Sequence, residues 1–451
     1  MLPRRVADAP RISFGGNMPV IGPSRQLRRM QWIAIVLVTA AIALNYMDRS
    51  TLAIGNLKIR EEFGINATAI GALGSAWALT YGIAQLPSGY LLDRIGPKFL
   101  VGAAMVLWSL CQAAGGFAAT YFLLMLSRIG LGATEAPCFP SATRSVSDWF
   151  DVKDRGTPSG VYTSGAYIGP TLAPPILTGL MLAFNWRVMF IVMGLAGVVA
   201  AALWFMVYRD PRAAVLEPQD EEYLRPNREA QSSVSLRQWS SLFRFRAMWV
   251  LMLGAFCTGY ITWMYQTWLP AYLEMQQHIS IAKTGFLASV PLICAFFGAL
   301  CGGYVSDRLV KGGMDLIASR RLPLVLGLLG SAAFTGLAAV ATGAGMAVTC
   351  IAVSMFCMQF GITCKWILVT AVTPQAYCAS AASNQNFAGF LGGTLSPILT
   401  GFIVDMTGSF VLALAIGAVI TLIGAGLFQF MMTTVIDERE LEKFAAAPAP
   451  A

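Results

Sequence analysis

Apolar stretches of about 20 residues alternate with short polar loops along most of this chain. A helix of that length matches the thickness of a bilayer, so each stretch is predicted to be a membrane-spanning helix. The predicted spans are 30–53, 67–91, 97–118, 121–147, 157–181, 187–208, 247–273, 283–306, 321–342, 345–370, 380–404 and 410–433. The pattern therefore predicts an all-α membrane protein with twelve spanning helices.

A longer polar stretch divides these spans into two sets of six. The predicted organisation is an N-terminal tail (1–29), a first six-helix bundle (30–208), a linker loop (209–246), a second six-helix bundle (247–433) and a C-terminal tail (434–451). Composition agrees with a membrane protein, because 56% of the 451 residues are hydrophobic and only 12% are charged. Soluble domains carry about 25% charged residues.

Lys and Arg are distributed unequally between the two sets of loops. If the N-terminus is cytoplasmic, the cytoplasmic segments hold most of the 31 basic residues, and the opposite loops hold only Lys58, Arg60, Arg187 and Lys283. This bias predicts that both termini are cytoplasmic. The net charge of +8 then reflects topology and contact with anionic membrane lipid, and no nucleic-acid partner is predicted.

Two short motifs recur at corresponding places in the two halves. Gly89–Arg94 (GYLLDR) follows the second span, and Gly303–Arg308 (GYVSDR) follows the eighth. The sequence PILTG occurs at Pro175–Gly179 in the fifth span and again at Pro397–Gly401 in the eleventh. Parallel repeats of this kind are typical of transporters whose two halves rock about a site near the bilayer midplane.

The repeated Asp-Arg pairs lie at cytoplasmic helix ends. An aspartate there can pair with basic groups of a neighbouring helix and so hold one conformation closed. We therefore predict a conformational latch formed by Asp93, Arg94, Asp307 and Arg308. The alternative interpretation is a turn that carries ordinary cytoplasmic positive charge.

Five charged side chains fall inside predicted spans: Asp48, Arg49, Arg128, Glu135 and Lys365. A charge near the bilayer centre costs at least a few kcal/mol unless it is paired or faces water, so this set predicts a charged cargo. The single histidine, His278, falls in an external loop, so neither a histidine proton relay nor a metal site is predicted. No phosphate-binding Gly-rich loop and no nucleophile–base pair is visible, which argues against ATP-driven transport and against an enzyme.

The loop after the second span resembles the signature of the major facilitator superfamily. Gly89–Lys98 matches it closely, with Pro97 where a basic residue is common. Within that superfamily the chain resembles the anion:cation symporters, through Asn45–Arg49 (NYMDR), Arg128–Pro137 (RIGLGATEAP) and Asn386–Gly389 (NFAG). The resemblance covers nearly all of 25–435. It implies a twelve-helix fold in two bundles, and together with the short first external loop it indicates a monomer in a bacterial inner membrane.

Chemistry and resemblance together suggest roles for the intramembrane charges. Arg49 is predicted to grip a substrate carboxylate, because its planar fork matches that group and stays charged. The resemblance implies that Asp48 and Glu135 carry the coupling protons, since carboxylates can bind and release them. Arg128 would adjust the proton affinity of Glu135, within a network in which Asp48, Arg49, Arg128 and Glu135 pair with one another. The alternative is a buried ion-pair cluster that only holds helices together.

Lys365 departs from the family pattern, which has a small or polar residue at that position. It could bind a second anionic group on the substrate, extend toward the surface, or pair with Glu135 across the cavity. Ala166 is a second departure, because the hexonate carriers have an amide there. The predicted substrate-binding residues are Arg49, Tyr46, Tyr81, Gln85, Arg128, Lys365, Trp366 and Asn386.

The sequence therefore predicts a proton-coupled symporter that imports a small organic anion by alternating access, without a cofactor other than protons. The predicted substrate is a sugar acid (a hexonate, hexuronate or hexarate), and the alternative is an aromatic or dicarboxylic acid. A drug/proton antiporter fits less well, because it would have a more apolar cavity without a substrate-gripping arginine. A membrane sensor also fits less well, because no soluble output domain follows the spans.

Overall fold

The computed structural model describes residues 22–441 except 212–213, 215, 230–233, 278–286 and 288. His278, Lys283, most of the predicted N-terminal tail and the end of the C-terminal tail lie outside the described residues. The described part is helical. In its first half the helices are α1 (Arg25–Phe63), α2 (Ala67–Ile95), α3 (Pro97–Gly116), α4 (Tyr121–Glu135), α5 (Cys138–Trp149), α6 (Gly156–Ala183) and α7 (Trp186–Val207).

Two short helices, α8 (Pro218–Glu229) and α9 (Leu236–Ser241), lie in the linker. The second half contains α10 (Arg246–Met275), α12 (Ser289–Lys311), α13 (Leu316–Ala339), α14 (Ala344–Val372), α15 (Cys378–Thr407) and α16 (Val411–Gly426), which continues as a π-helical turn at Leu427–Met431. Single 3₁₀ turns occur at Val152–Asp154, Leu242–Arg244 and Gln375–Tyr377.

Local sequence signals set many of the helix ends. The side chains of Ser24, Asn66 and Asn185 accept hydrogen bonds from backbone N–H groups in the first turns of α1, α2 and α7. Gly64 ends α1 in a left-handed conformation (φ 61°), which glycine adopts without strain. Helix α1 is consequently longer than the predicted span 30–53.

The fourth span differs from the prediction of one continuous helix over 121–147. The chain breaks there between α4 and α5, because Pro137 and Pro140 lack the N–H groups that would continue the ladder. Pro140 would be the partner of the Ala136 carbonyl, which instead accepts a hydrogen bond of 3.0 Å from Nε2 of Gln85 on α2. The break therefore joins α2 to the end of α4, where Glu135 is the last helical residue.

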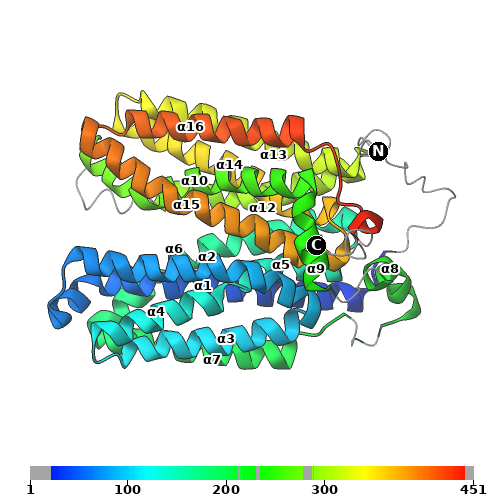
Figure 1. Cartoon of the computed structure of the whole chain (residues 1–451), viewed down its shortest axis with the longest axis horizontal. Helices are drawn as coiled ribbons and strands as arrows, with labels where there is room; N and C mark the ends of the chain where they lie inside the picture. The colour runs from blue at the N-terminus through cyan, green and yellow to red at the C-terminus, as the bar shows by residue number, and fades with distance from the viewer. Residues whose placement is uncertain are drawn as a thin grey trace, which may run out of the picture.

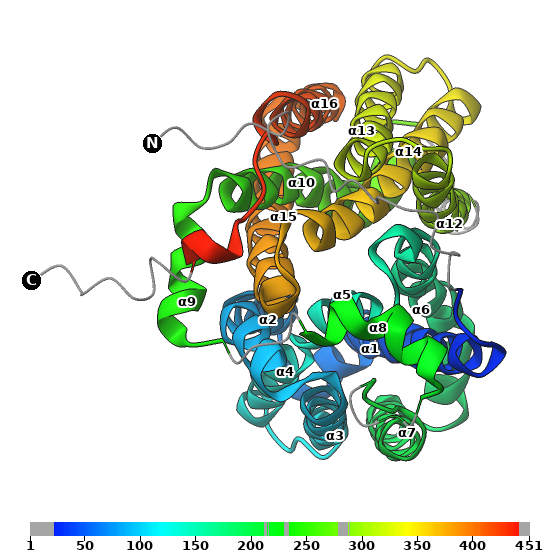
Figure 2. The same cartoon turned by 90° about the vertical axis from the view of Figure 1, so that its right-hand side faces the viewer.

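Ten of the described helices are long and apolar enough to cross a membrane by themselves. Helix α2 and the broken pair α4–α5 complete the twelve spans in the described part of the chain. Figure 1 shows the helices of the first half lying beside those of the second half, with α8 and α9 at one end of the molecule. Figure 2 looks at that end and shows the two bundles meeting where α6 lies beside α12 and α2 beside α15.

Candidate functional site

A cavity of about 990 Å³ lies between the two bundles. Its walls include Gly71 and Gly74 near the start of α2, and Pro397 and Ile398 near the far end of α15. It therefore occupies the part of the molecule away from α8, on the side that the distribution of basic residues assigns to the exterior. Deeper in the molecule, a smaller cavity of about 100 Å³ shares several of its lining residues, Tyr46 and Phe390 among them.

Arg49 on α1 lines the large cavity and forms an ion pair inside the first bundle. Its Nε donates to Oε2 of Glu135 at 3.2 Å, and its Nη2 donates to Oδ1 of Asn45 one turn earlier at 2.5 Å. Glu135 is fully buried, and the same Oε2 accepts a hydrogen bond of 3.0 Å from Nε1 of Trp77. One carboxylate oxygen, Oε1, is left without a partner among the described residues.

Three aromatic rings surround the guanidinium of Arg49. Its Cζ lies 4.3 Å from the ring centre of Tyr46, 4.5 Å from Trp77 and 4.8 Å from Tyr81. A cation over an aromatic face is attracted by the ring quadrupole, most strongly where water is excluded. The rings thus hold the guanidinium in place at the cavity wall. The Arg49 side chain remains 13% exposed.

Asp48 and Arg128 lie behind this wall rather than on it. Asp48 is fully buried, and neither oxygen of its carboxylate has a hydrogen-bond partner within the described chain. Arg128 donates to Oε1 of Gln112 at 3.0 Å and covers the ring of Phe190 at 4.6 Å. Of the four-residue network expected from the sequence, only the Arg49–Glu135 pair is formed in the described residues, and Arg128 does not reach either cavity.

Lys365 on α14 lines the deeper cavity from the second bundle. It is 6% exposed, its Nζ donates to Oγ1 of Thr258 at 3.1 Å, and it lies 5.4 Å from the ring centre of Trp366. It forms no ion pair with any residue that the structure describes. The alternatives of pairing with Glu135 and of extending to the surface are both wrong for this conformation, because Glu135 is paired with Arg49 and Lys365 is buried.

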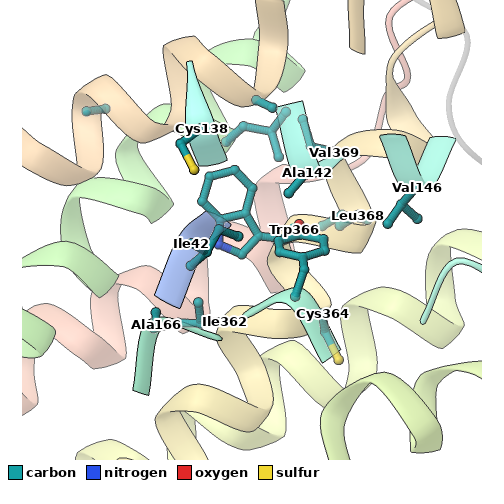
Figure 3. Packing of buried hydrophobic residues seen from close by; sticks show 14 of the residues in the cluster. Ile42, Cys138, Ala142, Val146, Ala166, Ile362, Cys364, Trp366, Leu368 and Val369 are labelled. Carbon is teal, nitrogen blue, oxygen red and sulfur yellow. The ribbon is translucent and has the colours of Figure 1, made fainter. Parts of the chain in front are cut away.

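Trp366 and Asn386 also line the deeper cavity. The rest of the Trp366 side chain packs in the hydrophobic core, where its ring centre lies 5.1 Å from that of Phe139. Figure 3 shows Trp366 surrounded by Ile42, Cys138 and Val369. Asn386 reaches across the two bundles, since its Nδ2 donates to the hydroxyl of Tyr81 at 3.5 Å.

Gln85 does not line either cavity. It is fully buried, and besides its bond to Ala136 it receives the hydroxyl of Ser383 from α15 at its backbone carbonyl. The same hydroxyl also lies 3.3 Å from its Oε1, so Gln85 joins α2 to α15 through both its backbone and its side chain. A direct substrate contact by Gln85, as expected from the sequence, would require a different conformation.

Sequence reasoning missed several residues that line the cavities, notably Trp77, Thr258, Tyr167 and Phe390. One signal was available: Trp77 lies one helical turn before Tyr81, so the two share a face. Threonine and phenylalanine are too common in membrane helices to be singled out from one sequence. Tyr167 is recognisable only in space, where its hydroxyl donates to Oε1 of Gln359 across the bundles at 2.9 Å.

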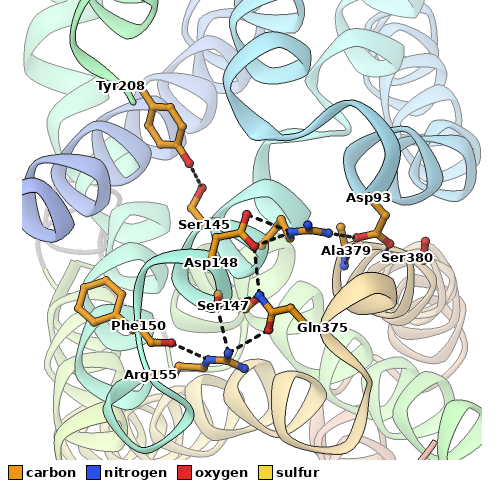
Figure 4. Close-up of polar contacts among 11 residues, drawn as sticks. Asp93, Ser145, Ser147, Asp148, Phe150, Arg155, Tyr208, Gln375, Ala379 and Ser380 are labelled. Carbon is orange, nitrogen blue, oxygen red and sulfur yellow. Dashed lines mark hydrogen bonds and ion pairs between the residues drawn. The ribbon is translucent and has the colours of Figure 1, made fainter. Parts of the chain in front are cut away.

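Asp93 joins the two bundles at the end of the molecule where α8 lies. One oxygen of its carboxylate accepts hydrogen bonds from Nη1 of Arg144 (2.6 Å) and from the N–H of Ala379 (3.0 Å), and the other accepts from the N–H of Ser380 (2.7 Å). Asp93 of the first bundle thus caps the N-terminus of α15 in the second. Figure 4 shows this contact beside Asp148, with which Arg144 also pairs at 2.9 Å.

Asp307 makes the reciprocal contact from the second bundle. Its carboxylate accepts hydrogen bonds from the N–H groups of Gly156 (2.8 Å) and Thr157 (2.6 Å) at the start of α6, and pairs with Arg320 at 3.0 Å. Gly156 and Gly303 allow this approach, because a side chain at either position would meet the other's backbone carbonyl. Both aspartates therefore bond helix N-termini of the opposite half.

The two arginines of the predicted latch do not take part in these contacts. Arg94 donates to the hydroxyl of Tyr90 on its own helix at 3.1 Å. Arg308 covers the ring of Tyr304, also on its own helix, at 5.1 Å. The geometry therefore separates the four predicted latch residues into two aspartates between the bundles and two arginines at the surface.

A family model described as Major Facilitator Superfamily matches residues 38–377, which is most of the chain. The chain belongs to the major facilitator superfamily. It is therefore a multi-pass membrane transporter and not an enzyme, and members of this superfamily generally need no cofactor.

Two relatives show which superfamily members this transporter is similar to. The probable L-galactonate transporter of Escherichia coli K12 is 41% identical over 95% of this chain and 97% of the relative. The probable galactarate/D-glucarate transporter GarP of the same strain is 30% identical over 92% and 97%. The facilitator fold is also that of a solved structure, the transporter FucP in the outward conformation, with a TM-score of 0.70, 15% identity and coverage of 90% of this chain and 100% of FucP.

Proposed function

We propose that this transporter imports a sugar acid together with protons across a bacterial inner membrane, working as a monomer by alternating access. Two similar proteins support the substrate class, because their names refer to L-galactonate, a sugar monoacid, and to galactarate and D-glucarate, which are sugar diacids. The observation that carries the proposal is the Arg49–Glu135 pair at the cavity wall. It brings together the group that would bind a carboxylate and a group that can bind a proton.

The proposed coupling rests on competition for Arg49. A substrate carboxylate that binds the guanidinium offers it a second anion, which weakens the hold of Arg49 on Glu135. Glu135 is fully buried, and a buried carboxylate that loses its cation is more stable as the neutral acid. Substrate binding and protonation of Glu135 would therefore favour one another, which is the requirement for symport.

Asp48 would carry a second proton. Its carboxylate is buried without a hydrogen-bond partner among the described residues, so the neutral acid is the less costly form in this conformation. Release would follow when the bundles rock and Asp48 gains water or a cation. Asp48 neighbours Arg49 in the chain, so movement of α1 would act on both residues.

The cavity composition weighs against a drug/proton antiporter. Arg49 and Lys365 place positive charge on the walls, which would repel the cationic compounds that such antiporters export. Aromatic acids are a second candidate substrate, because Tyr46, Tyr81 and Phe390 offer ring faces in the same cavity. Sugar hydroxyls would instead use polar groups such as Gln359 and Asn386.

Transport in proteoliposomes tests this function. An inward proton gradient is applied, and uptake and current are measured with galactonate, galactarate, a hexuronate and benzoate. Uptake of a sugar acid that rises with the proton gradient is expected. Uptake of benzoate alone would move the assignment to aromatic acids. Gradient-independent uptake of a sugar acid would keep the substrate class and remove proton coupling.

A further inference from the structure

Lys365 is a cation in the last third of α14, and no acidic side chain of the described residues neutralises it. The residue is only 6% exposed, its ammonium group has the neutral hydroxyl of Thr258 as its hydrogen-bond partner, and it forms no ion pair with the described residues. An ammonium removed from water without a counter-ion is costly, so positions of this kind are rarely kept without a use. The charge faces the deeper cavity, where a ligand could supply the missing anion.

Arg49 provides the contrast within the same binding region. It already has an anion from its own bundle, Glu135, and an amide oxygen from Asn45. The two cations come from opposite halves of the transporter, Arg49 from α1 and Lys365 from α14. The large cavity that Arg49 lines and the deeper cavity that Lys365 lines are adjacent, because they share wall residues, including Tyr46, Trp263 and Gln266.

We propose that Lys365 binds a second carboxylate of the substrate, so that this transporter prefers sugar diacids to sugar monoacids. The inference deepens the proposed function and rests on it. Galactonate and galactarate make a matched pair for this choice, because they differ only at C6, which is a neutral CH₂OH in the first and a carboxylate in the second. A diacid held by Arg49 and Lys365 would also connect the two halves.

Binding to the purified full-length transporter tests the inference without depending on proton coupling. Trp77, Trp263 and Trp366 line the cavities, so quenching of tryptophan fluorescence can report occupation. Wild-type protein should bind galactarate more tightly than galactonate, by about tenfold for one charge-assisted contact. The variant Lys365→Gln should lose that preference and keep its affinity for galactonate, and Lys365→Arg should restore part of the preference.

The matched control is Lys58→Gln, which removes a lysine from the exposed Lys58–Glu61 pair at the end of α1. It should leave both affinities unchanged. Retained galactonate binding by Lys365→Gln also shows that this variant is folded. If Lys365→Gln lowers both affinities equally, or if the wild type binds galactonate as tightly as galactarate, the diacid inference is wrong while the sugar-acid function stands. If the wild type binds and transports none of galactonate, galactarate and a hexuronate, the proposed function fails and the inference fails with it.

Discussion

Arg49 makes its described polar and aromatic contacts within the first bundle, with Asn45, Glu135 and three rings. Its guanidinium is therefore oriented before any substrate arrives. A preorganised donor loses little side-chain entropy on binding, so more of the interaction energy appears as affinity. At the residue scale, the proposed carboxylate grip and the proposed proton site are parts of one cluster.

The first prediction concerns the geometry of that grip. Arg49→Lys keeps the positive charge but removes the planar fork and its fit between the rings. Affinity for a sugar acid should fall by about 10- to 100-fold, as expected for loss of about 1.5–3 kcal/mol from charged hydrogen bonds. Titration of tryptophan fluorescence measures it, with the exposed Arg94→Lys as control. Unchanged affinity would move the carboxylate grip away from Arg49.

The second prediction concerns Asp48. Asp48→Asn has nearly the same shape and cannot lose or gain a proton, so it should still exchange substrate across the membrane. It should no longer accumulate substrate above the external concentration when a proton gradient is imposed. Counterflow and gradient-driven uptake in proteoliposomes separate the two activities. The exposed Glu61→Gln serves as control, and full accumulation by Asp48→Asn would exclude this residue from coupling.

At the element scale, helix ends carry much of the architecture. The break between α4 and α5 leaves the carbonyl of Ala136 to Gln85, and the N-termini of α6 and α15 are bonded by aspartates of the other half. Each contact uses a backbone group that a continuous or isolated helix would leave without a partner. The same groups that end the helices therefore hold neighbouring helices together.

The third prediction tests the aspartate contact at α15. Asp93→Asn removes the charge and one acceptor, which should destabilise the closed arrangement by about 1 kcal/mol for the helix cap and further through loss of the buried ion pair with Arg144. Cys378, the first residue of α15, is now 1% exposed and should react several-fold faster with a polar maleimide. Mass spectrometry of the Cys378 peptide measures the rate. Arg94→Ala should have no effect, and continued protection of Cys378 in Asp93→Asn would exclude the latch.

The twelve-helix fold could be predicted because bilayer-length apolar stretches carry a strong signal that does not depend on detail. Pro137 is a sequence signal for the helix break, but an average of hydropathy over 121–147 does not detect it. Two motifs predict a network that includes Arg49 and Glu135, but they do not say which pair within it forms. The position of Gln85 and the isolation of Lys365 could not be foreseen, because each depends on which groups the other bundle brings near.

At the scale of the whole molecule, the large cavity lies at one end and the aspartate contacts lie at the other. Basic residues predict that the closed end, with the linker helices α8 and α9, faces the cytoplasm. From these features we propose that the transporter is open toward the exterior in this conformation.

The fourth prediction tests this orientation. A C-terminal green fluorescent protein should be fluorescent in a bacterial host, because it folds in the cytoplasm, and a C-terminal alkaline phosphatase should be inactive there. A phosphatase inserted after Gly64, in the loop between α1 and α2, is the positive control and should be active. The reverse result would place the large cavity on the cytoplasmic side, so that this conformation would be the inward-facing one.

The aspartate contacts have a consequence for measurements made far from them. A site that faces outward only part of the time binds external substrate with an affinity reduced by the fraction of molecules in that state. We propose that Asp93 and Asp307 help to set this fraction, although neither lines the cavity. The apparent affinity for external substrate would thus depend partly on residues at the opposite end of the molecule from the large cavity.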